Sequence, residues 1–248
     1  GVVKTFEDIE ENRRLGKMSA LLTIEEGGVC QGEIAFLRNF YRLGVRMMTL
    51  TWNFRNELGW PNIIRIEGDE AYFEPDTEHG LTETGIEFVR EMERLGMIMD
   101  VSHLSDAGIM DVFRYTKKPF VASHSNARTV ASNPRNLTDE MLKTLSERGG
   151  VAGINYCADF LHDWQRGEHA VSRVDDMILH MKHMKKIGGI QCIGLGSDFD
   201  GIGGELEIKS PEDLPVLEQA MRRAGFTEEE IEGVFYKNVL RVYKDILK

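Results

Sequence analysis

Short apolar segments alternate with amphipathic ones along most of this chain. The apolar segments have the length and the apolar or β-branched content of buried strands, and they cover residues 19–24, 46–51, 97–102, 119–123, 151–155 and 192–197. The amphipathic segments have helical spacing and cover residues 5–15, 32–43, 82–95, 105–116, 137–148, 173–186, 211–223 and 227–247. This alternation predicts βα units, and therefore a parallel sheet with right-handed crossovers.

Residues that favour helix ends mark several boundaries in this pattern. Thr82 is a predicted N-cap for a helix that ends at Gly96, and Thr138 is a predicted N-cap for the helix that stops at Gly149. Residues 53–80 are rich in Asn, Gly, Pro and acids and show no clear period. We expect a long loop there, and long loops in compact domains are often functional.

Four of the predicted strands end next to a residue that can bind a metal or move a proton. His103 and His124 follow two of these strands, Glu25 follows a third, and Asp198 follows the last. In a (β/α) barrel the carboxyl ends of the strands converge on one face, where two imidazoles are natural metal ligands. The alternative for a histidine is a core residue whose ring is hydrogen-bonded inside the protein. The alternative for an aspartate is a helix N-cap, which suits Asp200 better than Asp198.

Composition and charge narrow the class of protein. The chain has 42% hydrophobic and 29% charged residues, as soluble globular proteins do, and its net charge of −11 argues against nucleic acid or an anionic membrane as a partner. Three cysteines, Cys30, Cys157 and Cys192, form no disulfide or zinc-knuckle pattern. With no transmembrane stretch and no signal peptide, these features favour a cytoplasmic protein.

The strand count bears on the fold class. A closed barrel of this kind needs eight strands, whereas the pattern predicts about six. An open doubly wound sheet would account for six strands, but it gives no reason for ligands at four strand ends to converge. We therefore expect one domain over residues 1–248, a (β/α)8 TIM-type barrel lacking its first two strands. The edges of strands 19–24 and 192–197 should then be unpaired, or covered by something other than a native barrel strand.

Several motifs in this order resemble the membrane (renal) dipeptidase family of binuclear zinc peptidases, most closely its bacterial members. They are Leu-Thr-Ile-Glu-Glu-Gly-Gly at 22–28, Asp-Val-Ser-His at 100–103, Ser-His-Ser-Asn-Ala at 123–127, Pro-Arg-Asn-Leu-Thr-Asp at 134–139 and Gly-Ser-Asp-Phe-Asp-Gly at 196–201. The resemblance covers essentially the whole chain. It implies an amidohydrolase-like barrel and zinc-dependent hydrolysis of the peptide bond of dipeptides.

The resemblance also implies roles for five residues. Glu25 matches the glutamate that bridges two zinc ions, and His103 and His124 match the histidines that complete one of the zinc sites. Arg135 matches the arginine that holds the substrate carboxylate. Asp198 matches the catalytic aspartate beside the bridging water, which also meets the substrate amino group.

The sequence departs from the family pattern at two places. The family's first strand carries a His-x-Asp pair that holds the second zinc, and no His-x-Asp occurs in this sequence. We therefore expect an N-terminally truncated chain, with at most one of the two zinc ions of a complete site. Trp52 stands where the mammalian pattern has a histidine that contacts the substrate carbonyl, which puts oxyanion stabilisation at this position in doubt.

Two other functions remain open from the sequence. One is another amidohydrolase-type reaction on a lactam, lactone or cyclic amide, which uses the same metals. The other is a catalytically impaired remnant that binds a ligand or needs a partner to complete it. The sequence also leaves open whether the chain forms a homodimer. We expect His180 and His183, three residues apart on a predicted helix, to be structural rather than a surface metal pair.

Overall fold

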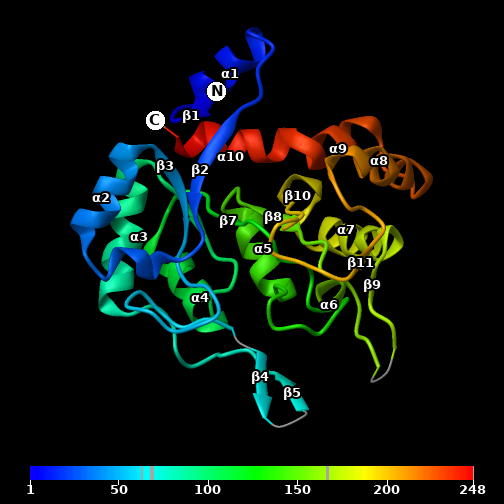
Figure 1. The fold of residues 1–248 in the computed structure, drawn as a ribbon, viewed down its shortest axis with the longest axis horizontal. Coiled ribbons are helices and arrows are strands. Elements are labelled where there is room, and N and C mark those ends of the chain that lie inside the picture. The colour runs from blue at the N-terminus through cyan, green and yellow to red at the C-terminus, as the bar shows by residue number, and fades with distance from the viewer. Residues whose placement is uncertain (63, 68–69, 166–167, 248) are drawn as a thin grey trace. The chain divides into compact units, whose positions relative to one another are not determined.

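The computed structural model describes residues 1–62, 64–67, 70–165 and 168–247. The chain divides into two compact units. The first unit comprises residues 1–63, 75–121 and 241–248, and the second comprises residues 64–74 and 122–240. Figure 1 labels the helices and strands of the chain. The expectation of a single domain over residues 1–248 stays a prediction.

The elements of the first unit are β1 (Val2–Val3), α1 (Phe6–Arg14), β2 (Ala20–Ile24), the 3-10 helix η1 (Gly27–Cys30), α2 (Ile34–Leu43), β3 (Val45–Thr49), α3 (Glu83–Leu95), β6 (Ile98–Asp100) and α4 (Asp106–Tyr115). Those of the second are β4 (Ile64–Glu67), β5 (Glu70–Phe73), α5 (Asp139–Glu147), β8 (Val151–Ile154), α6 (Ala158–Leu161), β9 (Val171–Ser172), α7 (Val174–Gly188), η2 (Ile190–Cys192), β10 (Ile193–Leu195), β11 (Glu205–Leu206), η3 (Pro211–Asp213), α8 (Leu214–Arg223), α9 (Glu228–Glu232) and the π-helix η4 (Gly233–Lys237). The division between the units passes through β7 (Val121–Ala122) and α10 (Asn238–Ile246).

Parallel strands form the centre of the first unit. β2 pairs with β3, β3 with β6, and β6 with β7 through Asp100 and Val121. Helices α2 and α3 lie side by side, with α2 against β3 and α3 against β6 (Figure 1). The apolar face of α3 is fully buried at Phe88, Val89 and Met92, as the helical spacing predicts.

A short strand covers the edge of β2. We expected the edge of strand 19–24 to be unpaired or covered by something other than a native barrel strand, and here Val2 pairs in parallel with Ala20 and Val3 pairs with Leu21. A two-residue strand is too short to produce a recognisable hydrophobic period, so the sequence pattern missed it. The sheet therefore has seven strands, in the order β1-β2-β3-β6-β7-β8-β10. Among the described residues no pairing joins β10 to β1 and closes the sheet.

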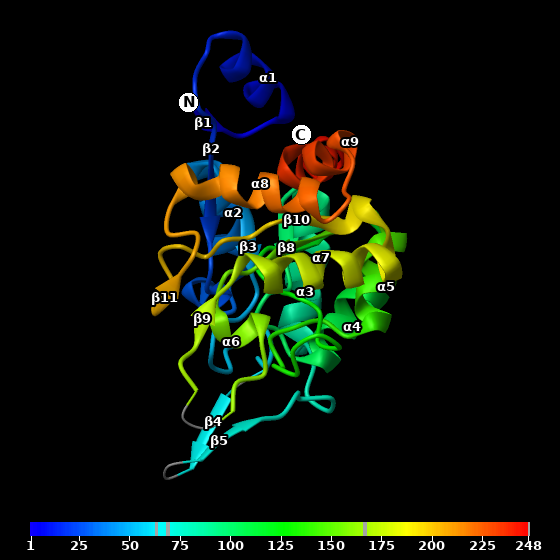
Figure 2. The ribbon, with the colours of Figure 1, turned by 90° about the vertical axis from the view of Figure 1, so that its right-hand side faces the viewer.

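Helices cover the strands of the second unit. β8 and β10 pair in parallel, α7 packs against both of them, and α5 and α8 pack against α7 (Figure 2). The Met177, Met181 and Met184 side chains of α7 are completely buried and pack in the core. The predicted helix over 227–247 is present as α9, η4 and α10, so a π-helical segment interrupts it.

The segment 53–80 is not a structureless loop. Its residues 64–67 and 70–73 form the antiparallel pair β4–β5, and residues 63 and 68–69 lie outside the described part of the chain. The predicted caps are confirmed: the Thr82 hydroxyl accepts from the backbone N–H of Gly85, the Thr138 hydroxyl accepts from that of Met141, and Gly96 ends α3 with a φ of 78°.

Together these observations confirm the predicted fold class of an α/β protein built on a parallel sheet of βα units. Among the described residues, no helix has both the length and the apolar content that crossing a bilayer requires.

His180 has a structural role inside the second unit. Its Nδ1 accepts a hydrogen bond from the backbone N–H of Ala127 at 3.1 Å, and its Nε2 donates to the Leu161 carbonyl at 3.1 Å. The ring is fully buried, and burial lowers the pKa of His180 from 6.5 to about 4. His183 instead pairs with Asp139 at 2.7 Å. The two hydrogen bonds of His180 fit the expected structural role, and the role of His183 stays a prediction.

A pH-dependent stability follows from this burial. Between about pH 6.5 and pH 4 the unfolded chain binds a proton at His180 that the folded chain does not, so stability falls as the pH falls through this window. The pKa difference corresponds to about 3 kcal/mol. We expect the free energy of unfolding, measured in urea at pH 7 and pH 4, to drop less in His180→Gln than in the parent chain. Equal drops in the two proteins would contradict this explanation.

Candidate metal centre

Glu25 and His103 meet at the carboxyl ends of β2 and β6, the two strands that flank β3 in the first unit. Glu25 directly follows β2, and His103 lies three residues after the end of β6. The His103 Nε2 atom lies 3.2 Å from Oε1 of Glu25. The imidazole is buried, with 5% of its side chain exposed, whereas the Glu25 side chain is 54% exposed. The imidazole is therefore held in the protein interior, and the carboxylate faces solvent.

The second nitrogen of His103 fixes the state of the ring. Its Nδ1 lies 2.8 Å from Oδ1 of Asn53, an amide oxygen that can only accept, so Nδ1 carries the proton. Nε2 faces the Glu25 carboxylate at 3.2 Å, with a proton in the imidazolium form and with its lone pair in the neutral form. Two acceptors at this distance repel each other unless a proton or a metal cation binds them. The pair therefore fits a metal ion, and Asn53 supplies the outer hydrogen bond that metal-bound histidines commonly make.

A testable consequence concerns Asn53. We expect Asn53→Ala to weaken zinc binding by about 10- to 100-fold, because the imidazole loses its orienting acceptor. Asn53→Asp keeps an acceptor at this position and should retain tight binding. Competition with a chromophoric chelator measures both affinities. Unchanged affinity in Asn53→Ala would show that this hydrogen bond does not orient the His103 ring for metal binding.

Glu26, next to Glu25, has a structural role. Its Oε1 accepts from the Gly28 N–H at 2.7 Å and from the Asn56 side-chain amide at 2.6 Å, and its Oε2 accepts from the Trp52 N–H at 2.9 Å. These bonds cap η1 and connect it to the segment after β3. Of the two adjacent glutamates, only Glu25 is directed toward the histidine.

Trp52 lies beside the same histidine. Its ring centroid is 6.3 Å from that of His103 and 5.1 Å from that of Phe54, in an edge-on contact, and 39% of the residue is exposed. The indole ring therefore lies next to the pair formed by Glu25 and His103. It has a single N–H donor, so it cannot bind a metal or carry a proton in a reaction.

Backbone strain marks two of the predicted site residues. His103 has a φ of 70° and Asp198 a φ of 60°, and among the described residues only Gln31 shares such a positive φ without being a glycine. Left-handed backbone is unfavourable for these residue types and occurs disproportionately at functional sites. In both cases the strained residue lies three positions after the last residue of its strand.

In the second unit Asn155 connects His124 with Asp198. The Asn155 side-chain amide donates to Oδ2 of Asp198 at 3.1 Å and to the His124 carbonyl at 3.5 Å. The ring of His124 is buried, and its Nδ1 lies 2.7 Å from the hydroxyl of Ser123. Asn155 directly follows β8, so a third strand end contributes to the same arrangement.

The turn after Asp198 requires a glycine. The backbone N–H groups of Gly201 and Ile202 both donate to the Asp198 carbonyl, at 3.0 and 3.1 Å. A Cβ atom at Gly201 would lie 2.3 Å from Oδ1 of the Asp198 carboxylate. The glycine therefore leaves the space that this carboxylate occupies.

Arg135 is buried on the loop between β7 and α5, whereas a loop arginine would ordinarily be exposed. Its guanidinium lies over the ring of Phe160, 5.2 Å from the centroid, and its backbone N–H donates to Oδ1 of Asn133. The loop is held by Asn126 and Asn136, both fully buried, which bond to each other and to the Phe160 carbonyl.

The cysteines take no part in these arrangements. Burial raises the pKa of Cys30 to about 11, and burial together with the charges of Asp159 and Asp198 raises the pKa of Cys157. Cys192 is fully buried beside β10. Thiols of this kind stay protonated near neutral pH and are poor metal ligands and nucleophiles.

Sequence reasoning missed three of the residues that organise the site: Asn53, Asn126 and Asn155. Asn155 stands at the end of a predicted strand, the same signal that singled out the histidines and carboxylates. Asn126 follows His124 by two residues inside a motif that we quoted without assigning it a role. Nothing in the sequence pattern distinguishes Asn53 from the other polar residues of its segment.

Comparison with known proteins decides the family. The family model described as "Membrane dipeptidase (Peptidase family M19)" matches residues 1–248. The chain belongs to this family. The resemblance seen in the motifs is thereby confirmed.

Relatives and solved structures agree with this assignment. The chain is 38% identical over 237 residues to an uncharacterized dipeptidase of Schizosaccharomyces pombe, covering 94% of this chain and 54% of that protein. It resembles the crystal structure of dipeptidase AC, a family M19 metallopeptidase, with a TM-score of 0.90, 31% identity and coverage of 99% of this chain and 71% of that one. A Rhodobacter sphaeroides metallopeptidase bound to a phosphinate mimic of L-Ala-D-Ala gives the same TM-score and identity, covering 99% and 68%.

Proposed function

We propose that this M19 chain is a zinc-dependent dipeptidase whose metal is held by Glu25, His103 and His124. The contact between Glu25 and His103 carries the proposal, because it places an imidazole nitrogen 3.2 Å from a carboxylate oxygen. One carboxylate and two imidazoles form a donor set that suits zinc and leaves a position for water. Within the described part of the chain, these three residues are a group that could hold a metal ion.

The strand register supports the third ligand. Asp100 of β6 pairs with Val121 of β7, and each of the two histidines follows its paired residue by three positions. Parallel strands put such positions at the same end of the sheet. Asp198 likewise follows Leu195, the last residue of β10, by three positions.

The other residues would bind the substrate and move its protons. When bound, the zinc supplies an acidified water and polarises the scissile carbonyl. The Asp198 carboxylate would accept and relay a proton, and it would also pair with the substrate ammonium. The Arg135 guanidinium would hold the free carboxylate of the substrate, which restricts the substrate to dipeptide length.

The experiment is zinc titration of the metal-free chain with L-Ala-L-Ala and L-Ala-D-Ala as substrates. We expect hydrolysis that rises with zinc and saturates near one ion per chain, because only one set of three ligands is present among the described residues. Two tightly bound ions per chain would contradict this ligand count. Hydrolysis of a lactone or cyclic amide, without cleavage of either dipeptide, would overturn the proposed substrate class.

A further inference from the structure

Two exposed aromatic side chains next to the candidate metal ligands have no function assigned above. The ring of Trp52 lies 6.3 Å from that of His103 and makes an edge-on contact with the ring of Phe54 at 5.1 Å. Trp52 is 39% exposed and Phe54 is 56% exposed. Neighbouring exposed aromatic residues beside a candidate catalytic site are typical of a ligand-binding surface. We call Trp52 and Phe54 the aromatic pair.

Hydrogen bonds hold the segment that carries the aromatic pair. The Trp52 backbone N–H donates to Oε2 of Glu26 at 2.9 Å, and the side-chain amide of Asn56 donates to Oε1 of the same carboxylate at 2.6 Å. Between the two aromatic residues, Oδ1 of Asn53 lies 2.8 Å from Nδ1 of His103. An aromatic surface that is already fixed in this way loses little conformational entropy when it binds a ligand.

The aromatic pair lies within reach of a substrate at the metal. The two β-carbons of a dipeptide are two and three bonds from the scissile carbonyl carbon, which is at most about 4 Å. A dipeptide whose carbonyl is at a metal held by His103 therefore carries its side chains close to the neighbouring indole. The Glu25 side chain is 54% exposed, so a ligand can reach this end of the strands from solvent.

The chemistry of this surface favours an apolar group. The indole and phenyl rings present apolar surface, and their one hydrogen-bond donor is the indole N–H of Trp52. The charged side chains nearby are already engaged. Both carboxylate oxygens of Glu26 accept hydrogen bonds, and the guanidinium of Arg55 packs over the ring of Trp60, 4.3 Å from its centroid. An aliphatic or aromatic side chain is therefore the ligand group that fits.

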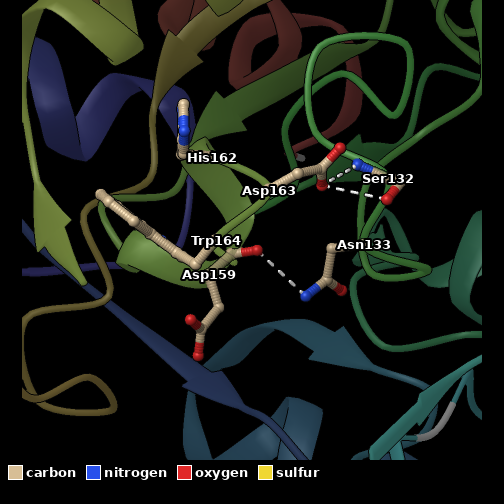
Figure 3. A pocket seen from close by; sticks show the side chains of 6 residues that line it. All are labelled: Ser132, Asn133, Asp159, His162, Asp163 and Trp164. Atoms are coloured by element: carbon tan, nitrogen blue, oxygen red, sulfur yellow. Dashed lines mark hydrogen bonds between the residues drawn. The ribbon is translucent and has the colours of Figure 1, made fainter. Parts of the chain in front are cut away.

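A pocket of about 320 Å³ in the second unit differs from this surface. Figure 3 shows the side chains that line it: Ser132, Asn133, Asp159, His162, Asp163 and Trp164. None of them is a proposed metal ligand, and the carboxylates of Asp159 and Asp163 point in different directions (Figure 3). The Trp164 ring packs against His162 at 4.6 Å, and its N–H donates to the Ala158 carbonyl at 3.0 Å. We therefore assign no ligand to this pocket.

We infer that the aromatic pair binds an apolar side chain of the dipeptide and gives the enzyme a preference for bulky aliphatic or aromatic residues. This inference rests on the proposed function, in which His103 holds the catalytic zinc. The substrate side chain packs against the indole of Trp52 and the ring of Phe54. Both residues of a dipeptide are short enough to reach the pair, so the experiment compares the two positions.

The test measures kcat/KM of the zinc-loaded chain for L-Ala-L-Ala, L-Phe-L-Ala and L-Ala-L-Phe. We expect at least about a tenfold higher value for one of the phenylalanine peptides than for Ala-Ala, because its ring leaves water. Trp52→Ala should reduce this ratio to about twofold or less, and Phe54→Ala should reduce it in part. The ratio isolates the surface, because loss of zinc or partial unfolding lowers both values equally. Phe36→Ala, which removes a ring of 40% exposure from α2, is the matched control and should keep the ratio.

The outcomes separate the two proposals. Equal or lower kcat/KM for both phenylalanine peptides, or a ratio that survives in both Trp52→Ala and Phe54→Ala, would overturn the assignment of the aromatic pair while leaving the dipeptidase intact. If no peptide is cleaved, the proposed function fails, and calorimetric binding to the zinc-loaded chain decides the aromatic pair. Tighter binding of a phenylalanine peptide that is lost in Trp52→Ala supports it. Equal binding of the three peptides, or no binding, overturns it.

Discussion

His103→Ala is expected to remove the bound zinc and to lower kcat/KM for dipeptides by at least about 10³-fold. The imidazole is buried, and it contributes one of three ligands through an already oriented ring. Without it, a carboxylate and a single histidine remain, too few to hold zinc tightly. The acidified water and the polarisation of the carbonyl are then lost together. Metal analysis of the dialysed protein, beside a dipeptide cleavage assay, measures both effects.

His169→Ala provides the matched control for this experiment. His169 is largely exposed and pairs with Glu205 at 2.7 Å, away from the proposed ligands in the sequence. Its loss should change neither the zinc content nor the activity by more than about twofold, as is usual for a surface substitution. Retention of zinc and activity in His103→Ala would disprove the ligand assignment.

Asp198→Asn is expected to lower kcat by about 10²- to 10⁴-fold while leaving the zinc content unchanged. The amide cannot accept a proton from the attacking water, and general acid–base catalysis contributes about this much. It also lacks the charge that would pair with the substrate ammonium, so KM should rise as well. The hydrogen bond from Asn155 can still reach a side-chain oxygen, so the local fold should survive.

Asp200→Asn tests whether the effect belongs to the carboxylate of Asp198 or to negative charge in this turn. Asp200 is exposed and lies two residues further along. We expect activity within about twofold of the parent. If both variants lose activity equally, the turn contributes through its overall charge and the specific role of Asp198 is wrong. If Asp198→Asn loses its zinc, Asp198 is a metal ligand and not the proton acceptor.

Much of the fold could be predicted because the spacing of apolar residues within each long segment indicates a helix or a strand. A helix such as α3 is predicted by a Thr N-cap, an apolar face at helical spacing and a terminal glycine, all of which lie within or next to the helix in sequence. The strands that precede Glu25 and His103 are likewise predicted by apolar runs. Parallel strands then bring their carboxyl ends together, so a sequence that ends strands in Glu, His and Asp predicts a site at that end.

The remaining features depend on contacts that are distant in sequence. The two-residue β1 exists because Val2 and Val3 find a partner in β2, and no local pattern specifies it. The hydrogen bond from His103 to Asn53 joins positions 50 residues apart, and that from Asn155 to Asp198 joins positions 43 apart. A buried asparagine and an exposed one look alike in sequence, because what distinguishes them is the set of partners that the fold supplies.

X-ray absorption spectroscopy of the zinc-loaded chain would show whether Glu25, His103 and His124 hold the catalytic zinc that we propose. We expect two imidazole nitrogens and oxygen ligands at about 2.0–2.2 Å, with no sulfur bound to the metal. His124→Ala should lose one imidazole ligand. A sulfur ligand at about 2.3 Å, or an unchanged ligand set in His124→Ala, would show that these three residues do not hold the zinc.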